Sequence, residues 1–181
     1  TGTTSIASGA VLRIWYVGSL GSGSYSANII NNGSLYYESS TAQTLSGIIS
    51  GSGNLVTSNY AGTLTLTNNN TYQGSTTINA GVVVVSKDSN LGSDPASPTP
   101  GNLTFGGGTL QTTASFTLNA NRGVSFGTGT FNVTSGTTLQ VDGIINSSGG
   151  SITKSGVGTL LLTGDDTNAG TTSFSISSGS V

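Results

Sequence analysis

The sequence predicts an all-β protein that forms a single parallel β-helix, a solenoid of about seven to eight coils. A long repeat is the first observation: residues 47–78 reappear without a gap as 143–174, and fourteen of the thirty-two positions are identical. A finer motif of glycine, a small or polar residue and an apolar residue recurs seven times, at steps of 20 to 29 residues. Periods of this length are typical of folds in which each unit buries its apolar face only against its neighbours.

Composition is the third observation. Ser, Thr, Asn and Gly dominate the 181 residues, 33% are apolar, and ten carry a charge, with a net charge of -2. Thr favours extended backbone, whereas Asn and Gly supply the turns between short strands. This fraction of apolar residues is low for a conventional two-layer core. The net charge is too small for self-repulsion to keep the chain disordered.

Short strands are predicted wherever apolar and polar residues alternate, because alternate side chains of a strand face opposite sides. The clearest cases are residues 63–67, 116–119, 130–134 and 138–142. The segments between them, such as 68–70 and 147–150, consist of turn residues. A β-sandwich also fits short strands with polar turns, but the repeat at the length of one coil favours the β-helix.

Columns of inward side chains are expected to hold the coils together, each contributing about 1.5 to 3 kcal/mol when buried. Because of the long repeat, Leu64 and Leu160 are expected at equivalent places in their coils, and a charge in any column is expected to break the stack. Outward Thr and Asn are expected to form hydrogen-bonded ladders between coils. The predicted core residues are Leu64, Leu66, Leu103, Phe105, Phe116, Leu118, Phe131, Val133, Leu139, Val141, Leu160 and Leu162.

One segment interrupts the pattern. Residues 91–101 contain all three prolines of the chain, none of which can donate a hydrogen bond to a neighbouring strand. We therefore expect one domain, 1–181, with a proline-rich loop leaving the coil at 91–101. That loop is either an insertion without a function or an exposed loop that recognises a binding partner.

Two segments carry a resemblance to a known family. Ser151–Gly164 contains Lys154, then Gly156-Val157-Gly158-Thr159-Leu160, and Gly62–Gly81 contains Asn70-Thr71-Tyr72-Gln73-Gly74. Together they resemble the autotransporter-associated β-strand repeat, whose copies run Lys-x-Gly-x-Gly-Thr-Leu and then Asn-Thr-Tyr-x-Gly. The resemblance implies a right-handed parallel β-helix in a bacterial surface or secreted protein, a stalk or passenger used in adhesion and biofilm, without catalytic residues. It also gives Lys154 a structural role on the coil surface.

Aromatic residues gather near the start of the chain. The five Trp and Tyr residues of the first forty positions are a candidate contact patch for a sugar or another protein, namely Trp15, Tyr16, Tyr25, Tyr36 and Tyr37. In a strand, neighbours such as 15 and 16 face opposite sides, so at least one of each pair should face outward. These residues could equally fill the first coils.

The sequence offers few residues that could catalyse a reaction. The sequence has no Cys, Met or His, which excludes thiol nucleophiles, imidazole bases and the commonest zinc ligands. The pair Asp165–Asp166 invites comparison with carbohydrate-active β-helix enzymes, but it occupies the turn filled by Asn69–Asn70 in the other copy. Arg13, Lys87, Arg122 and Lys154 are dispersed and expected in solvent. We expect no catalytic residue, no metal site and no cofactor.

The sequence thus favours a non-catalytic structural or adhesive β-helix segment, extracellular or on the bacterial cell surface. The alternatives are the subunit of an extracellular filament that polymerises end to end, and a carbohydrate-active enzyme. Expected partners are the rest of a longer repeat protein or identical chains stacked end to end, and surface glycans or surface proteins of host or bacterial cells. Four scattered cations offer no surface for nucleic acid, and no apolar run is long enough to span a membrane.

Overall fold

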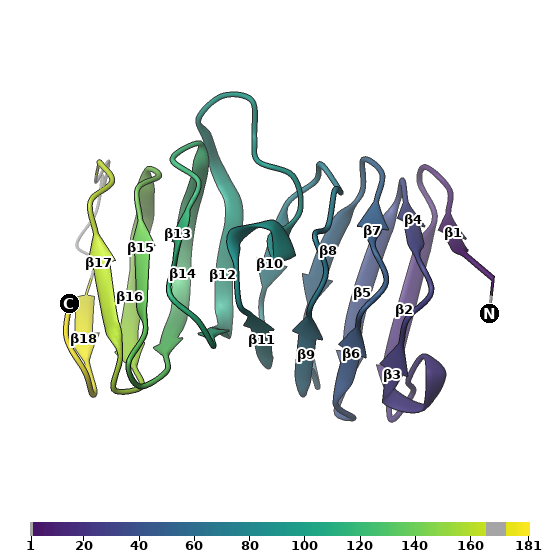
Figure 1. Cartoon of the computed structure of the whole chain (residues 1–181), viewed down its shortest axis with the longest axis horizontal. Helices are drawn as coiled ribbons and strands as arrows, with labels where there is room; N and C mark the ends of the chain where they lie inside the picture. Colours follow the sequence, from purple (N-terminus) through teal and green to yellow (C-terminus); the bar gives the residue numbers. More distant parts are fainter. Residues whose placement is uncertain (1, 166–172) are drawn as a thin grey trace.

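The chain coils into a stack of parallel strands in the computed structural model, which describes residues 2–165 and 173–181 (Figure 1). All strand pairings among these residues are parallel, and the strands make about eight turns of a β-solenoid. The only helical segments described are two short 3₁₀ turns, η1 (Gly21–Gly23) and η2 (Asp88–Leu91). The all-β parallel solenoid predicted from the repeats is confirmed.

The strands are short, except for β12, β14 and β16 in the second half, which have 14, 12 and 11 residues. The first half comprises β1 (Thr4–Ile6), β2 (Val11–Tyr16), β3 (Ser24–Tyr25), β4 (Ile29–Asn31), β5 (Ser34–Ser39), β6 (Gln43–Leu45), β7 (Ile49–Ser50), β8 (Asn54–Thr57), β9 (Thr63–Leu66), β10 (Thr76–Ile78) and β11 (Val82–Val85). The second half comprises β12 (Thr99–Thr112), β13 (Phe116–Leu118), β14 (Arg122–Val133), β15 (Thr138–Val141), β16 (Ile145–Ser155), β17 (Thr159–Leu162) and β18 (Ser173–Ile176).

Successive coils stack in register, so that chemically similar residues lie above one another. One column runs through β2, β5, β8, β10, β12, β14 and β16, and within it Leu12 pairs with Leu35, which pairs with Leu55. A second column runs through β3, β6, β9 and β11 and continues along the later halves of β12, β14 and β16 to β18. Two smaller sheets, β1–β4–β7 and β13–β15–β17, complete the coils.

The interior is filled by one continuous cluster of aliphatic and aromatic side chains. Ten of the twelve core residues expected from the sequence are buried, whereas Phe116 and Leu162 are partly buried and pack against the cluster. Three phenylalanines meet at its centre: Phe105 stacks on Phe126 at 4.6 Å between ring centres, and Phe131 meets both rings edge-on. Such aromatic pairs add about 0.5 to 1.5 kcal/mol each beyond their buried area.

Equivalence of Leu64 and Leu160, expected from the long repeat, is wrong. Leu64 on β9 is followed in its column by Val83, Leu110, Phe131 and then Lys154, so four coils lead to Lys154 and not to Leu160. Leu160 lies instead in the β13–β15–β17 sheet. Four coils from Leu64 thus span ninety residues, and the repeat offset of ninety-six residues exceeds them by six.

Asparagine side chains link the coils from within the turns. The Nδ2 group of Asn70 donates to the carbonyl of Asn90 at 2.7 Å, and Nδ2 of Asn90 donates back to the carbonyl of Asn68 at 2.9 Å. The backbone N–H of Ile49 in turn donates to Asn70 Oδ1 at 2.9 Å. Asn70 and Asn90 are buried, so these contacts differ from the outward ladders expected, and they satisfy backbone groups that a buried turn would leave unpaired.

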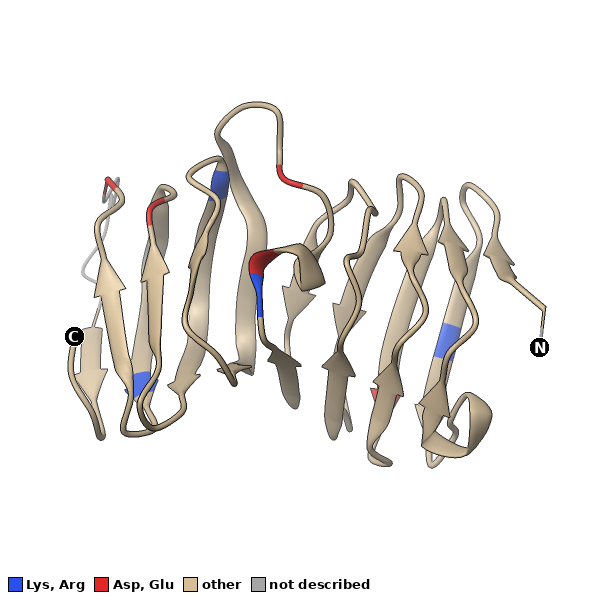
Figure 2. Ribbon diagram, in the orientation of Figure 1, with Lys and Arg blue, Asp and Glu red and all other residues tan. Residues whose placement is uncertain are grey.

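Charged residues are few, and Figure 2 shows them spread along the solenoid. Lys154 lies inside the stack beside Phe131, fully buried, and its Nζ donates to the carbonyl oxygens of Ser155 at 2.8 Å, Gly156 at 2.8 Å and Ser178 at 3.1 Å. Burial lowers the pKa of this ammonium group. The expectation that Lys154 lies on the coil surface is wrong: three backbone acceptors allow a cation in the column.

Buried Tyr72 makes folding sensitive to alkali. Its hydroxyl is hydrogen-bonded to Thr76 Oγ1 at 2.6 Å, and burial raises its pKa to about 12. The stability that neutral Tyr72 contributes is complete below its ordinary pKa of about 10 and is lost as the pH rises to about 12. We expect the wild-type chain to lose about 2 to 3 kcal/mol more than Tyr72→Phe over that interval. Urea unfolding at pH 9 to 12, followed by circular dichroism, measures the difference, and equal losses would contradict the assignment.

Candidate functional site

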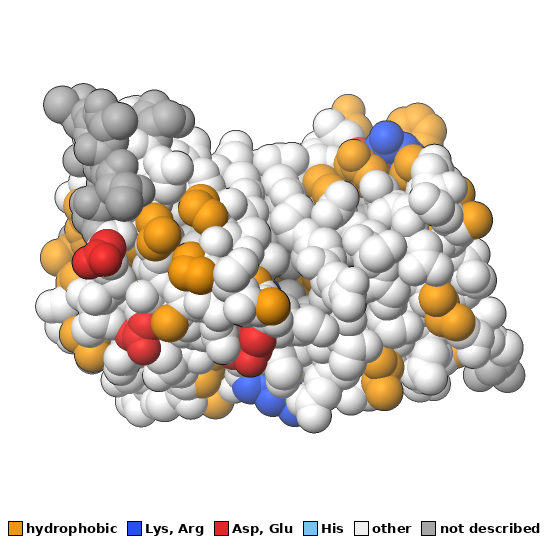
Figure 3. Space-filling model, turned by 90° about the horizontal axis from the view of Figure 1, so that it is seen from above, with side chains coloured by type: hydrophobic (Ala, Val, Ile, Leu, Met, Phe, Trp, Pro, Cys, Tyr) orange, Lys and Arg blue, Asp and Glu red, His pale blue; other side chains and the backbone are white. Residues whose placement is uncertain are grey.

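Aromatic side chains are exposed where β2 and the turn after β8 meet the surface. Trp15 is 63% exposed and Tyr16 66% exposed at the end of β2, and Tyr60 is 66% exposed in the turn after β8. Val17 is also exposed. We call Trp15, Tyr16, Val17 and Tyr60 the aromatic patch. Figure 3 shows hydrophobic side chains around a basic one at this end of the molecule.

Both Trp15 and Tyr16 face outward because the backbone turns at Tyr16, the last residue of β2. Tyr16 has a φ of 60°, in the left-handed region, and the N–H of Gly18 donates to the carbonyl of Trp15 at 2.8 Å to close the turn. A bulky residue with positive φ is uncommon and costs of order 1 to 3 kcal/mol. Strand alternation would have turned Tyr16 inward, so the turn is what makes the patch wider than one ring.

The other aromatic residues of the predicted contact patch lie elsewhere. Tyr37 is buried, and its hydroxyl donates to the carbonyl oxygens of Thr41 and Thr63. Tyr25 is partly buried and is hydrogen-bonded to Thr4 Oγ1 at 2.6 Å. These two side chains serve the packing of the first coils. Tyr36 is half-buried and lies beneath the guanidinium group of Arg13, which is 4.3 Å from the centre of its ring.

A pocket of about 310 Å³ opens beside the patch and is lined by Arg13, Trp15, Glu38 and Asn59. Register places the first three together, because β2 pairs with β5 so that Arg13 lies opposite Tyr36 and Trp15 opposite Glu38. Asn59 comes from the next coil, just after β8. We call this the Arg13 pocket. Its residues lie in three successive coils, and only Trp15 was singled out for a contact role from the sequence.

Both carboxylate oxygens of Glu38 in the Arg13 pocket accept hydrogen bonds. Arg13 Nη1 donates to Glu38 Oε2 at 2.6 Å, while Ser58 Oγ and Asn59 Nδ2 donate to Oε1 at 2.8 and 2.7 Å. Burial raises the pKa of the Glu38 carboxyl group, but these hydrogen bonds and the charge of Arg13 outweigh it and leave the pKa below its usual value. Glu38 is therefore an ionised carboxylate with its charge matched by Arg13.

A second hollow, of about 320 Å³, lies under the proline-rich loop. It is lined by Gln73, Ser93, Asp94, Pro95, Ala96, Thr99 and Asn102. The loop lengthens its coil, since Gln111 follows its partner Val84 by twenty-seven residues, whereas Val84 follows Thr65 by nineteen. The boundaries expected for the loop, 91–101, include a buried Leu91 at the end of η2 and the first residues of β12.

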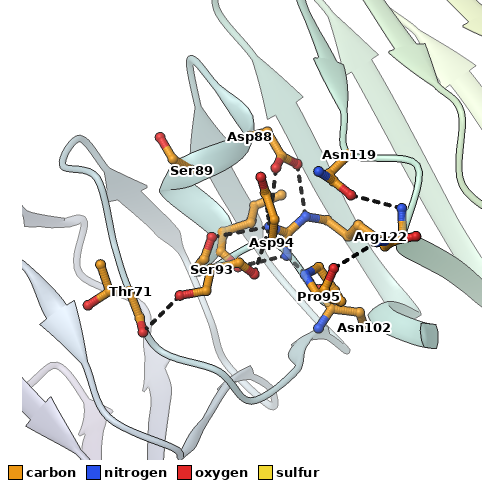
Figure 4. A network of polar contacts seen from close by, with 12 residues as sticks. Thr71, Asp88, Ser89, Ser93, Asp94, Pro95, Asn102, Asn119 and Arg122 are labelled. Atoms are coloured by element: carbon orange, nitrogen blue, oxygen red, sulfur yellow. Dashed lines mark hydrogen bonds and ion pairs between the residues drawn. The ribbon is translucent and has the colours of Figure 1, made fainter. Parts of the chain in front are cut away.

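Arg122 fastens this loop to the solenoid (Figure 4). Its Nε and Nη2 donate to the two carboxylate oxygens of Asp88, at 2.8 and 3.2 Å, and Nη1 donates to Asn102 Oδ1 at 2.5 Å. Three carbonyl oxygens at the start of the loop also accept from it, those of Leu91, Gly92 and Ser93. Arg122 is 1% exposed, so the expectation that it is solvated is wrong.

Most carboxylates in the described residues are bound to a cation or a hydrogen-bond donor, and Asp94 shares Arg122 with Asp88, at 3.5 Å from Nη2. Glu38 is bound to Arg13, Asp88 to Arg122, and Asp142 accepts hydrogen bonds from Gln140 and Thr163. Asp165 is exposed, and its neighbour Asp166 lies outside the described residues. The described residues contain no group of three or more His, Cys, Asp or Glu side chains that could hold a metal ion, and none of their helices could cross a membrane.

Two segments of the chain are similar to known sequence repeats. The family model described as passenger-associated-transport-repeat matches twice, at residues 56–85 and 152–179. An adhesin described as the BmaC autotransporter, from Brucella suis biovar 1 (strain 1330), is 38% identical over 126 residues, which are 70% of this chain and 4% of the relative.

The chain therefore spans a small part of the length of that relative. No solved structure matches the chain significantly. The two family matches cover the same two segments whose motifs resemble the autotransporter repeat, and they confirm that resemblance. Residues 56–85 and 152–179 are thus two copies of the passenger-associated-transport-repeat.

Proposed function

We propose that this chain is a non-catalytic, adhesive segment of an autotransporter passenger, exposed on the bacterial surface or released from it. Similarity to an autotransporter adhesin is the observation that carries the proposal. The solenoid supports it, because its interior is a continuous apolar cluster and its coils present side chains outward at fixed spacing. Expected partners are glycans or proteins on the surface of host or bacterial cells, reached through the aromatic patch and the Arg13 pocket.

The absence of catalysis is part of the proposal. A general acid and base must lie close together and be free to exchange protons, yet Glu38 and Asp88 are each paired with an arginine. The sequence supplies neither histidine nor cysteine. When the chain is incubated with pectin or alginate, we expect no increase in reducing ends or unsaturated products over buffer alone. Turnover that disappears in Asp165→Ala would contradict the proposal.

Adhesion is tested by displaying the 181-residue chain on a bacterium that does not adhere to cultured cells. We expect display to increase the number of bacteria retained after washing severalfold over the same strain that displays an unrelated solenoid. Retention equal to that of the unrelated solenoid, at equal surface density of the displayed chain, would overturn the adhesive assignment.

A further inference from the structure

The Arg13 pocket combines an exposed indole ring with polar groups that remain free to bind a ligand. Arg13 uses one N–H group for Glu38, and its other N–H groups make no hydrogen bond within the described part of the chain. Asn59 Nδ2 donates to Glu38, whereas Asn59 Oδ1 accepts nothing from the described residues. The pocket thus offers several donors, one acceptor and a flat apolar face.

Charge decides what kind of ligand these groups suit. The Glu38 carboxylate has its negative charge balanced by Arg13 at 2.6 Å, and both of its oxygens are already hydrogen-bonded. An acidic ligand would meet a guanidinium group whose charge is neutralised, and a basic ligand would meet a carboxylate that is 3% exposed. The pocket therefore favours a neutral ligand with several hydroxyl groups.

The volume of the Arg13 pocket limits the size of the ligand. A volume of about 310 Å³ is at the lower end of ligand pockets, enough for one six-membered ring with its substituents. A pyranose presents an apolar face of C–H groups, which can lie on the Trp15 ring, and hydroxyl groups at its rim, each of which both donates and accepts.

Building on the proposed adhesive function, we propose that the Arg13 pocket binds one neutral pyranose residue of a surface glycan. Its C–H face stacks on Trp15, one hydroxyl oxygen accepts from the free Arg13 N–H groups, and a neighbouring hydroxyl donates to Asn59 Oδ1. Tyr16 and Tyr60, the exposed chain neighbours of Trp15 and Asn59, contact the next sugar unit. The chemistry is shared by glycans of animal cells and by bacterial surface polysaccharides.

Trp15 provides its own reporter, because it is the only tryptophan in the chain. The wild-type chain is screened on an array that carries neutral and acidic glycans of both sources, and the best ligand is then titrated while tryptophan emission is recorded. We expect saturable binding of neutral glycans with a shift of the Trp15 emission to shorter wavelength, since a stacked sugar removes water from the indole ring. The source of the glycans bound identifies the target surface.

Three variants separate the roles of the pocket residues. Calorimetry measures the affinity of each variant for the glycan. Trp15→Ala should lower the affinity tenfold or more, whereas Trp15→Phe should retain most of it because an aromatic ring remains. Asn59→Gly removes the amide and keeps the backbone, which has a φ of 56°, and should also weaken binding. Val157→Ala, at an exposed apolar residue in another coil, is the matched control and should change nothing.

Three results would overturn this inference. The first is binding of acidic glycans alone, and the second is equal glycan affinity in Trp15→Ala and the wild type. The third is that the chain binds no glycan, although bacteria that display it are still retained on cultured cells. The last result would leave the adhesive function standing and would make the partner a protein. Failure of both the array and the display experiment would instead reject the adhesive function itself.

Discussion

Replacing Leu64 by lysine is expected to unfold the solenoid or to lower its free energy of unfolding by at least about 4 kcal/mol. Leu64 lies in the same column as Lys154 and is fully buried between Gln43 and Val83. An ammonium group there would be buried among apolar side chains, without the three carbonyl acceptors that Lys154 has. Urea unfolding followed by circular dichroism measures the loss.

Leu64→Met is the matched control for this change. Methionine nearly conserves volume and carries no charge, so the loss should stay below about 1.5 kcal/mol. If Leu64→Lys were as stable as Leu64→Met, position 64 would have to be open to water, and the interior column would be misassigned.

The second large effect is expected at Arg122. Arg122→Met keeps much of the side-chain volume but leaves Asp88, Asn102 and three loop carbonyls without their donor. Removing one partner of a buried ion pair typically costs about 3 to 5 kcal/mol, because the other charge stays buried and unpaired. We therefore expect a loss of this size, together with faster cleavage by protease between Gly92 and Ser97.

Lys87→Met serves as the control for Arg122→Met. Lys87 is an exposed cation next to η2, and its loss should change stability by less than about 0.5 kcal/mol. A double replacement, Arg122→Met with Asp88→Asn, should recover part of the loss, since the unpaired carboxylate is then removed. Equal effects of Arg122→Met and Lys87→Met would show that the loop does not depend on the ion pair.

The fold could be predicted because alternation and glycine spacing are local properties of the sequence. Residues such as Phe131 and Val133 alternate with polar neighbours, and that alone assigns their faces. The pairing of strands between coils, in contrast, depends on residues that are far apart in the sequence. The sequence repeat aligns Leu64 with Leu160, but four coils from Leu64 lead to Lys154 in β16, and Leu160 lies in another sheet.

Charged residues were the weakest part of the sequence-based prediction. Arg122 and Lys154 were expected in solvent, since long cationic side chains are seldom fully buried without a partner. Their partners are mostly backbone carbonyl oxygens and, for Arg122, an aspartate thirty-four residues earlier, and no sequence pattern shows that these groups converge.

The candidate site was predicted only in part for a related reason. Clustering of Trp and Tyr pointed to Trp15 and Tyr16, but Arg13, Glu38 and Asn59 meet only because three coils stack in register. An acid such as Glu38, isolated in an otherwise uncharged strand, was the one signal that could have indicated a buried polar site. End-to-end stacking of identical chains stays a prediction.

Direct binding to cells tests the central claim, that this solenoid segment is adhesive through its aromatic patch. The fluorescently labelled 181-residue chain is added to cultured cells and measured by flow cytometry, with Trp15→Ala/Tyr60→Ala and Val157→Ala alongside. Saturable binding that unlabelled chain displaces, retained in Val157→Ala and lost in the double variant, is the predicted result. Binding that does not saturate, or that is equal in all three proteins, would contradict it.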